Sequence, residues 1–341
     1  MTTQPRGSVH ISGSGTAAGG CYEEVTISGS GKLAGDVEAE RLRVSGAAKA
    51  LGNVKAGTLK ASGAFRVAGQ VEAEEFRCSG SAKVEGGARV TVLHASGALK
   101  VGGDVSGKEV EISGAGTFGG DVAAEHFRCD GRARVEGLLN ADTVEIISEG
   151  LSSAREIGGG EIRLLAGGGG GLLCRWWRRE GSFEVETIEG DDVYAEATKA
   201  AMVRGRGVTL GPGCSIGTVE YSESLHLDPG AAVENATYTG SGPTPEVITG
   251  AVTRPEGWAR RQGLPLHGPM RNPVVALLAA ALGLIIAVVV VALVLTVVLP
   301  AVGLVVGLVL GLVGLVLLLV IVGLPFLLLG AAFSHRRRGR G

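Results

Sequence analysis

The side chains that could do acid–base, nucleophilic or metal chemistry are few in this chain of 341 residues, and they lie far apart. The histidines are His10, His94, His126, His226, His267 and His335. None of them lies within metal-ligand spacing of another histidine or of a cysteine. Acidic pairs such as Glu74-Glu75 fit solvated turn charges, and no catalytic-triad spacing, nucleophile elbow or dinucleotide fingerprint is present. We therefore predict no catalytic residue, no metal site and no cofactor, in a protein that is not an enzyme.

Two neighbouring segments could instead bind a phosphate, a membrane or a partner. Residues 167–171 are consecutive glycines, but no lysine-serine pair or helix start follows, so they indicate a flexible link rather than a phosphate-binding loop. Just after them, the adjacent Trp176, Trp177, Arg178 and Arg179 could lie on a membrane surface or stack on a partner. We take these four as candidate contact residues. The plainer alternative is an exposed loop flank with one tryptophan packed on the fold.

The elements that must position any such residue repeat at an interval of 17. One glycine series runs from Gly29 to Gly131 and a second from Gly35 to Gly137, and glycine suits tight bends because it lacks a Cβ and can take positive φ. Apolar residues of one phase are Val25, Leu42, Leu59, Phe76, Leu93, Val110 and Phe127, and those two residues later are Ile27, Val44, Ala61, Cys78, Ala95, Ile112 and Cys129. Spacing by two points both side chains to one face of a strand. A fixed period of this kind indicates a stacked-repeat architecture.

Each period contains three such apolar pairs, at offsets of 6, 6 and 5 residues. The pattern predicts three short strands per turn, which bury their faces only when they stack on identical strands above and below. The fold class expected is therefore all-β, a three-sided parallel β-helix with turns about 4.8 Å apart. An amphipathic helix is excluded, because nothing favours a 3.6 period and glycine is too frequent.

Composition and charge narrow the class of protein further. The chain has 58 glycines, 11 prolines and only 4% aromatic residues, which fits a thin solenoid, and its net charge of −2 gives no case for nucleic acid. Cys78 and Cys129 share an inward phase three turns apart, roughly 14 Å at about 4.8 Å per turn, too far for a disulfide. Small buried thiols in a reduced compartment are expected. Residues 1–10 contain no apolar h-region, so we expect no cleavable signal peptide and a solenoid that stays in the cytoplasm.

The same patterns predict the order of the chain's parts. They are a disordered N-terminal tail over 1–7, the regular β-helix over 8–165, a Gly-rich and Trp-Arg insertion over 166–182, a second β-helical segment over 183–240, a Pro-rich linker over 241–272, two transmembrane helices within 273–333 and a basic cytoplasmic tail over 334–341. The second β-helical segment has less regular spacing than the first. The insertion therefore leaves the continuity between the two solenoid parts open.

The C-terminal transmembrane α-helical hairpin is expected because residues 274–333 contain no charged residue in 60 positions, enough for two spans with a break at Pro300. Arginines flank the run on both sides, which places both ends in the cytoplasm. A deeply inserted hairpin that never exposes its turn is the alternative. Small residues that could pack the helices closely are Gly303, Gly307, Gly311 and Gly314. Glycines that simply face lipid are the other interpretation of this series.

Two resemblances follow from the motifs. Residues 208–217 resemble the hexapeptide coils of left-handed β-helical transferases, but those coils close at a longer interval than the array here and usually present a histidine, which this stretch lacks. More closely, the Ser-Gly array over residues 8–240 resembles the bactofilins, and among them the long tandem form of Gram-positive bacteria. The segments on which this resemblance depends are residues 76–80, 135–142, 189–194, 203–205 and 211–221. It implies a right-handed β-helix that joins end to end into filaments without nucleotide, and a scaffolding role in the cytoplasm, often at the membrane.

We therefore expect a non-enzymatic scaffold at the cell membrane, with its solenoid on the cytoplasmic side. The unpaired strand edges at the solenoid ends would template another copy, in a head-to-tail contact that propagates without closing. Its partners would be further copies of itself, membrane lipid and unidentified client proteins. The alternative is a monomeric membrane-anchored adaptor or sensor that binds a partner laterally, with Trp176 and Trp177 as one contact. Charged residues capping both solenoid ends would favour that alternative. A hexapeptide-type transferase is the least favoured hypothesis.

Overall fold

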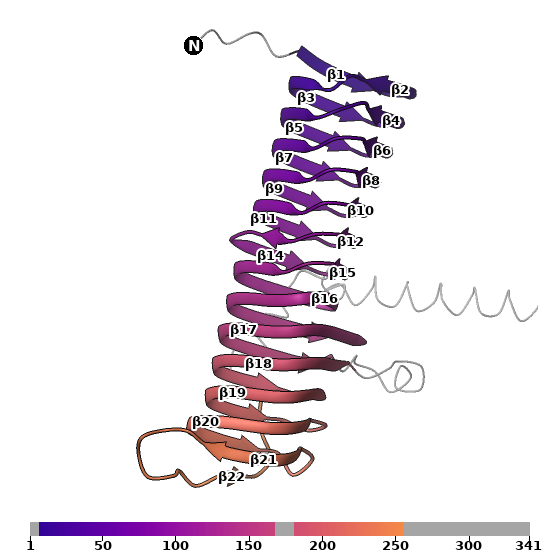
Figure 1. Cartoon of the computed structure of the whole chain (residues 1–341). Helices are drawn as coiled ribbons and strands as arrows, with labels where there is room; N and C mark the ends of the chain where they lie inside the picture. The colour runs from indigo at the N-terminus through magenta and orange to yellow at the C-terminus, as the bar shows by residue number, and fades with distance from the viewer. Residues whose placement is uncertain (1–6, 168–180, 255–341) are drawn as a thin grey trace, which may run out of the picture. The chain divides into compact units, whose positions relative to one another are not determined.

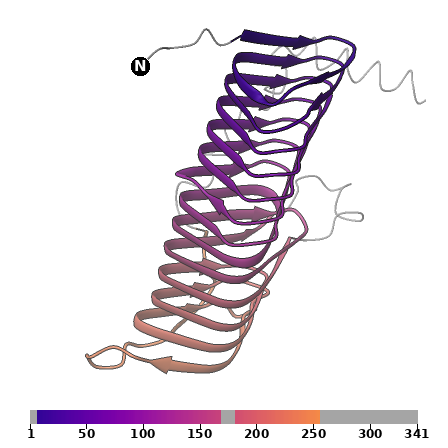
Figure 2. The ribbon, with the colours of Figure 1, turned by 45° about the horizontal axis from the view of Figure 1, so that its top comes forward.

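The described part of the chain is a parallel β-solenoid of about 13 turns. The structure is a computed structural model that describes residues 7–167 and 181–254. Within these ranges the strands form one 22-stranded sheet of parallel pairs and no helix is present (Figure 1). Figure 2 shows the successive turns as rings stacked on one another. The expectation of an all-β parallel β-helix is confirmed.

Up to β15 each turn is made of two or three short strands. β16 then runs over more than one turn, β17 to β20 each form most of one turn, and β21 and β22 form the last. The strands of the first turns are β1 (Gly7–Ile11), β2 (Ser14–Ala17), β3 (Gly20–Ile27), β4 (Ser30–Leu33), β5 (Val37–Val44), β6 (Ala47–Ala50), β7 (Val54–Ala61), β8 (Ala64–Val67), β9 (Val71–Cys78), β10 (Ser81–Val84), β11 (Ala88–Ala95), β12 (Ala98–Val101), β13 (Val105–Ser106), β14 (Glu109–Ile112) and β15 (Ala115–Phe118). Those of the later turns are β16 (Val122–Ser148), β17 (Leu151–Ala166), β18 (Ser182–Ala195), β19 (Thr198–Leu210), β20 (Ser215–Leu227), β21 (Ala232–Tyr238) and β22 (Ile248–Thr249).

The register of the ladder places one apolar residue of every turn in a single column inside the solenoid. The column is Val9, Val25, Leu42, Leu59, Phe76, Leu93, Val110, Phe127, Val144, Ile162, Val193, Val208 and Leu225. All but Val9, in the first described turn, are buried. Phe118 and Phe127, in neighbouring turns, meet edge to face with ring centroids 6.5 Å apart. The core is therefore one continuous apolar column, as the two apolar phases predict.

The first glycine series is required by backbone packing between turns. A Cβ built on Gly46 or Gly63 would lie closer than 3.0 Å to the carbonyl oxygen of the glycine one turn before it. Of this series only Gly131 has a positive φ, at 142°. The close approach of stacked backbones, rather than a left-handed conformation, therefore explains most of these glycines.

The second glycine series has a different cause. Asp36 Oδ1 accepts a hydrogen bond of 2.7 Å from the backbone N–H of Asn53 in the next turn, and Asp104 Oδ1 accepts one of 3.0 Å from Asp121. These oxygens occupy the space that a Cβ on Gly52 or Gly120 would need. A ladder of Asp and Asn side chains thus satisfies backbone donors along one corner, and it requires glycine beside it.

The solenoid continues across the Gly-rich insertion. Ile162 of β17 pairs with Val193 of β18, in a ladder that runs almost the whole length of both strands. The two described ends of the gap meet at one corner, where Gly167 N–H donates to the Ser148 carbonyl and Ser182 N–H to the Gly150 carbonyl, each at 2.8 Å. The two solenoid parts therefore form one continuous ladder, with the insertion leaving from a corner.

The predicted hairpin within 273–333 lies outside the described residues, as do the basic tail and most of the Pro-rich linker. In the ranges that the structure describes, no helix is long and apolar enough to cross a membrane.

Candidate assembly surfaces and exit corner

The N-terminal end of the solenoid presents an open strand edge. Ser30 N–H donates to the Gly13 carbonyl of the preceding turn, and Ala47 N–H donates to the Gly29 carbonyl, both at 2.9 Å. Ser14 pairs with Ser30 in the ladder and so occupies the same position in the first described turn. Among the described residues no turn precedes it. The N–H of Ser14 therefore points out of the end of the solenoid.

The side chains of this first turn do not protect that edge. Residues 7–20 contain no Asp, Glu, Lys or Arg, and the half-buried Val9, Ile11 and Ala17 extend the apolar core to the end. Natural edge strands are usually protected from pairing by charges, prolines or a covering segment. None of these devices occurs in the described residues of the first turn, whereas Pro5 and Arg6, which precede β1, lie outside the described residues.

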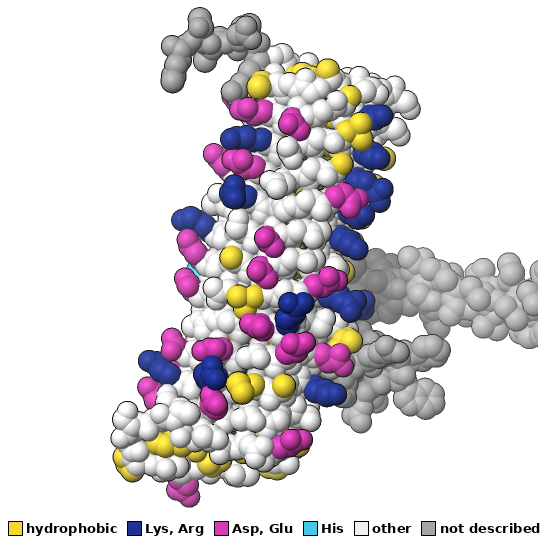
Figure 3. All heavy atoms as spheres, viewed as in Figure 1, with side chains coloured by type: hydrophobic (Ala, Val, Ile, Leu, Met, Phe, Trp, Pro, Cys, Tyr) yellow, Lys and Arg dark blue, Asp and Glu magenta, His cyan; other side chains and the backbone are white. Residues whose placement is uncertain are grey.

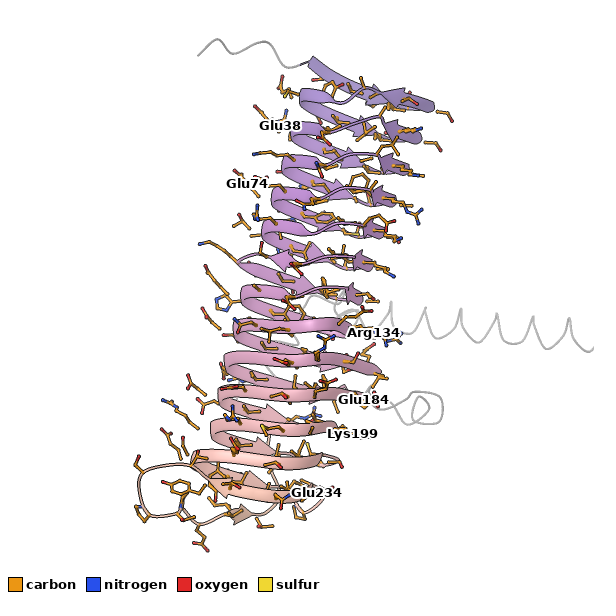
Figure 4. All side chains as sticks on the ribbon, in the orientation of Figure 1. Glu38, Glu74, Arg134, Glu184, Lys199 and Glu234 are labelled. Carbon is orange, nitrogen blue, oxygen red and sulfur yellow. The ribbon has the colours of Figure 1, made fainter. Side chains whose placement is uncertain are left out.

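The C-terminal end is also apolar but is partly covered by its own chain. Residues His226 and Leu227 at the end of β20 pair with β22, which completes the last turn. Val247 and Ile248 are exposed there to 38% and 54%. Glu234, in β21, is the acidic residue labelled at this end in Figure 4. Each end of the solenoid thus offers apolar side chains beside strand edges.

After β22 the chain turns back along one corner of the solenoid, which we call the exit corner. It is formed by Ala166, Glu196, Gly211 and Asp228, one from each of four successive turns. Gly250 N–H donates to the Leu227 carbonyl at 3.1 Å, and Val252 N–H donates to the Asp228 carboxylate at 3.1 Å. The segment 250–254 therefore runs backward over turns that precede it.

Arg254, the last described residue, is held at the exit corner by a buried carboxylate. Its Nε and Nη2 donate to the two carboxylate oxygens of Glu196 at 2.7 and 2.6 Å, and Nη2 also donates to the Ala166 carbonyl at 2.9 Å. The Tyr194 hydroxyl donates to Glu196 at 2.7 Å. The Glu196 side chain is only 5% exposed, so this bidentate pair neutralises a charge that would otherwise be buried alone. We call this group the exit clasp.

The electrostatics and packing around the exit clasp agree with its geometry. Burial, and then the hydrogen bond to Glu196, raise the pKa of the Tyr194 hydroxyl well above its usual value. The hydrogen bond to Glu196 also raises the pKa of Arg254. A Cβ on Gly211 would lie 2.9 Å from Cγ of Glu196, so glycine leaves room for the clasp. The clasp fixes Arg254, the last described residue, against the solenoid.

The structure places the described histidines and Glu74 on the outside of the solenoid. His94 is half-buried with Nδ1 2.9 Å from a carboxylate oxygen of Glu111, and His126 is exposed. Glu74 is also exposed. Over residues 7–167 and 181–254, no group of three His, Cys, Asp or Glu side chains could hold a metal ion.

Three of the four described cysteines lie in the interior. Burial raises the pKa of the Cys129 thiol to about 12 and that of the Cys214 thiol to about 11. Burial also raises the pKa of Cys78, whereas Cys21 is exposed. The interior thiols are therefore protonated and inert at neutral pH.

The candidate site residues of the sequence analysis lie outside the described residues. They are the contact candidates Trp176, Trp177, Arg178 and Arg179, and the helix-packing candidates Gly303, Gly307, Gly311 and Gly314. Two groups that the structure brings together are not predicted above. One is the exit clasp, whose partners Glu196 and Arg254 are 58 residues apart with no motif between them. The other is a row of cations, described below, whose signal is a Lys or Arg at the interval of 17.

The fold defines a class of protein, a parallel β-solenoid whose described turns are stacked in one ladder. Residues 2–89 match the bactofilin family, described as polymer-forming cytoskeletal. Over residues 2–89 the chain is therefore bactofilin-like, and the resemblance stated from its motifs is confirmed for this part.

The relatives add little about function. The chain is 40% identical over 91 residues to the uncharacterized protein YhbF of Bacillus subtilis (strain 168), and 41% identical over 91 residues to YhbE of the same strain. Each match covers 27% of this chain and only 37% or 38% of the relative. No solved structure matches.

Proposed function

We propose that this protein is a non-enzymatic scaffold that polymerises through the ends of its solenoid at the cytoplasmic face of a membrane. The observation that supports polymerisation best is the N-terminal edge, where the Ser14 N–H points outward from a turn without Asp, Glu, Lys or Arg. A second copy stacked there would pair this donor and cover Val9 and Ile11. The polymer-forming description of the matched family agrees with this mechanism.

The finer parts of the proposal extend beyond the described residues. A head-to-tail contact joins two different ends and propagates without closing, so it would give filaments. The right-handed winding is proposed from the family resemblance. Residues 274–333 would tether the filament to lipid as two helices, because 60 positions without charge can span a bilayer twice. Client proteins would then bind along the sides of the solenoid.

The monomeric adaptor is the second hypothesis. Charged residues that cap both ends of the solenoid would favour it. The first described turn has none, but the polar tail over residues 2–6, which lies outside the described residues, could cap the N-terminal end. Glu234 and Glu246 near the C-terminal end are the features that favour it.

The proposal is tested by removing one edge donor. Ser14 is the first residue of β2, a position at which a strand tolerates proline, so Ser14→Pro should leave the circular dichroism spectrum unchanged. It should shorten or abolish filaments of the full-length protein in mild detergent, seen by negative-stain microscopy and light scattering. Ser14→Ala keeps the N–H and should polymerise like the parent.

Two outcomes would contradict the proposal. A parent protein that stays monomeric at high concentration in every salt condition would favour the adaptor. Filaments of equal length in Ser14→Pro would exclude the N-terminal edge as the assembly surface.

A further inference from the structure

One face of the solenoid carries a row of cations of a single sign. The row is Lys32, Lys49, Arg66, Lys83 and Lys100, and each member pairs directly with the next in the ladder. We call the surface over residues 28–34, 45–51, 62–68, 79–85 and 96–102 the cationic face. Figure 3 shows Lys and Arg side chains along one edge of the upper solenoid, where Figure 1 labels β4 to β12.

Acidic residues hardly compensate this row. The five segments of the cationic face contain one acidic residue, Glu85, which lies 2.7 Å from the Lys83 amine and 4.0 Å from the Arg66 guanidinium. The hydrogen bond from Lys83, and then the surrounding positive charges, lower the pKa of Glu85. The field on this face is therefore positive.

A row on another part of the same solenoid alternates in sign. Glu38, Lys55, Glu72 and Arg89 follow one another in the ladder with alternating sign, and the Lys55 amine lies 3.2 Å from the Glu72 carboxylate. Like charges directly opposite each other on neighbouring strands destabilise a sheet, whereas opposite charges stabilise it. The cationic row thus opposes folding where the alternating row supports it. An anionic partner explains why the solenoid has such a row.

The geometry of the row fits a flat anionic surface. At about 4.8 Å per turn, Lys32 and Lys100 are roughly 19 Å apart along a straight line. The other outward residues of these short strands are serine or alanine, for example Ala47 in β6 and Ser81 in β10, so the cations project beyond them. Arg134 continues the column after Thr117, and Figure 4 labels it farther along the same side.

The exit corner borders this face. The exit corner continues, in the later turns, the corner that holds the Ser-Gly pairs in the earlier turns. Glu149 N–H donates to the carbonyl of Gly131 at this corner, and Ser148, one residue earlier, pairs with Ala166. In the earlier turns the same corner comes directly before the strands that carry the cations, β4, β6, β8, β10 and β12. The two ends of the insertion gap and the last described residue, Arg254, therefore lie along the edge of the face that bears the cations. The last described residue of the solenoid thus lies at the border of the cationic face.

We propose that the cationic face lies on the anionic headgroups of the membrane and sets the orientation of the solenoid on it. This inference rests on the membrane attachment proposed above. Nucleic acid also carries phosphates, but no aromatic side chain projects among the row strands β4 to β12 to stack on a base, and the chain as a whole is slightly acidic. A lipid surface is therefore the partner that the observations favour.

The test is amine footprinting of the full-length protein in vesicles, with acetylation of each lysine measured by mass spectrometry. Vesicles of pure phosphatidylcholine are compared with vesicles containing phosphatidylglycerol, at low salt and at 0.5 M NaCl. Lys32, Lys49 and Lys100 should be several-fold less reactive on the anionic vesicles at low salt only, because salt screens the contact. Lys55, Lys60 and Lys108 project from other parts of the solenoid and should react equally in both lipids.

A variant separates this contact from any effect of polymerisation. In K32Q/K49Q/K100Q the remaining Lys83 serves as a reporter and should lose its lipid-dependent protection. The matched control K55Q/K60Q/K108Q removes the same number of positive charges elsewhere on the solenoid. In this control Lys83 should keep its lipid-dependent protection. Equal reactivity of the row in neutral and anionic vesicles would overturn the proposal, and so would protection by duplex DNA but not by anionic vesicles.

Flotation of the same samples distinguishes the two proposals. If the protein floats with neutral vesicles but its row lysines are not protected from acetylation on anionic vesicles, the result supports the tether and excludes the cationic contact. If the protein floats only with anionic vesicles and its row lysines are protected there, the result supports the cationic contact and excludes the apolar tether.

Discussion

A glycine of the Ser-Gly corner contacts the backbone of the turn before it, and this contact sets what the residue can be. At Gly63 the space for a Cβ is taken by the carbonyl oxygen of Gly46. A backbone oxygen cannot move to another rotamer, so only a shift of the whole turn could relieve the clash. Gly13 lies at the same corner of the first described turn, and nothing lies within 4 Å of its Cβ position.

Gly63→Ala should therefore destabilise the full-length protein by about 1–3 kcal/mol. Gly13→Ala is the matched control and should change stability little, because no backbone opposes it in one copy of the chain. Thermal unfolding followed by circular dichroism measures both. Equal melting temperatures of the two variants would show that the turns can separate freely at this corner.

At the scale of elements, corners accept additions while strands keep their register. β17 and β18 stay paired from end to end although residues 168–180 lie between them in sequence. The column residues Ile162 and Val193 are 31 positions apart, and without residues 168–180 the interval becomes 18, the same as that from Val144 to Ile162. The insertion is thus a corner addition to a turn of ordinary length.

Removal of residues 168–180, with Gly167 joined to Gly181, should leave the solenoid intact. The two ends already meet at one corner, where a Cβ on Gly181 would lie 3.0 Å from the Gly167 nitrogen. The melting temperature should fall by no more than a few degrees. A large loss of β signal in circular dichroism would show that the insertion contributes to the core.

The control moves the same segment from the corner into a strand. Residues 168–180 placed between Val193 and Tyr194 would interrupt β18 where it pairs with both β17 and β19. This variant has the composition of the parent, and it should melt at a much lower temperature because the ladder is broken on both sides. Equal melting temperatures of the parent and this variant would show that strands accept additions as readily as corners do.

At the scale of the whole solenoid, each turn contacts only the turns before and after it. Its stability is then close to a sum of turn energies and nearest-neighbour interfaces. One full period can be removed without changing any remaining register, since β6 and β8 present the same positions. Loss of a partial turn breaks the register at the junction.

Deletion of residues 47–63 joins Gly46 to Ala64 and should give a protein that unfolds cooperatively, with the same circular dichroism per residue. Deletion of residues 47–55 removes only about half a turn and should broaden the transition and lower its midpoint much more. Thermal melts of both full-length variants check this. A cooperative melt at the parental temperature for the half-turn deletion would contradict a register-dependent solenoid.

The periodic part of the sequence was sufficient to predict the fold and the family. The column from Val25 to Phe127 could be assigned from spacing alone, because in a solenoid each residue's neighbour lies one period away in the sequence. The Lys32 row obeys the same rule, and its interval of 17 was present in the sequence as a signal. In this solenoid the position of a residue in the 17-residue repeat therefore determines whether its side chain is buried almost as directly as its chemical type does.

Only the tertiary structure decided what happens where the period fails. The pairing of β17 with β18 depends on how a corner closes over the segment 168–180, which no periodic pattern reports. The exit clasp joins Glu196 to Arg254 because the chain reverses after β22 and crosses turns that precede it. Such contacts arise from the path of the backbone in space, and the spacing of residues along the chain contains no record of that path.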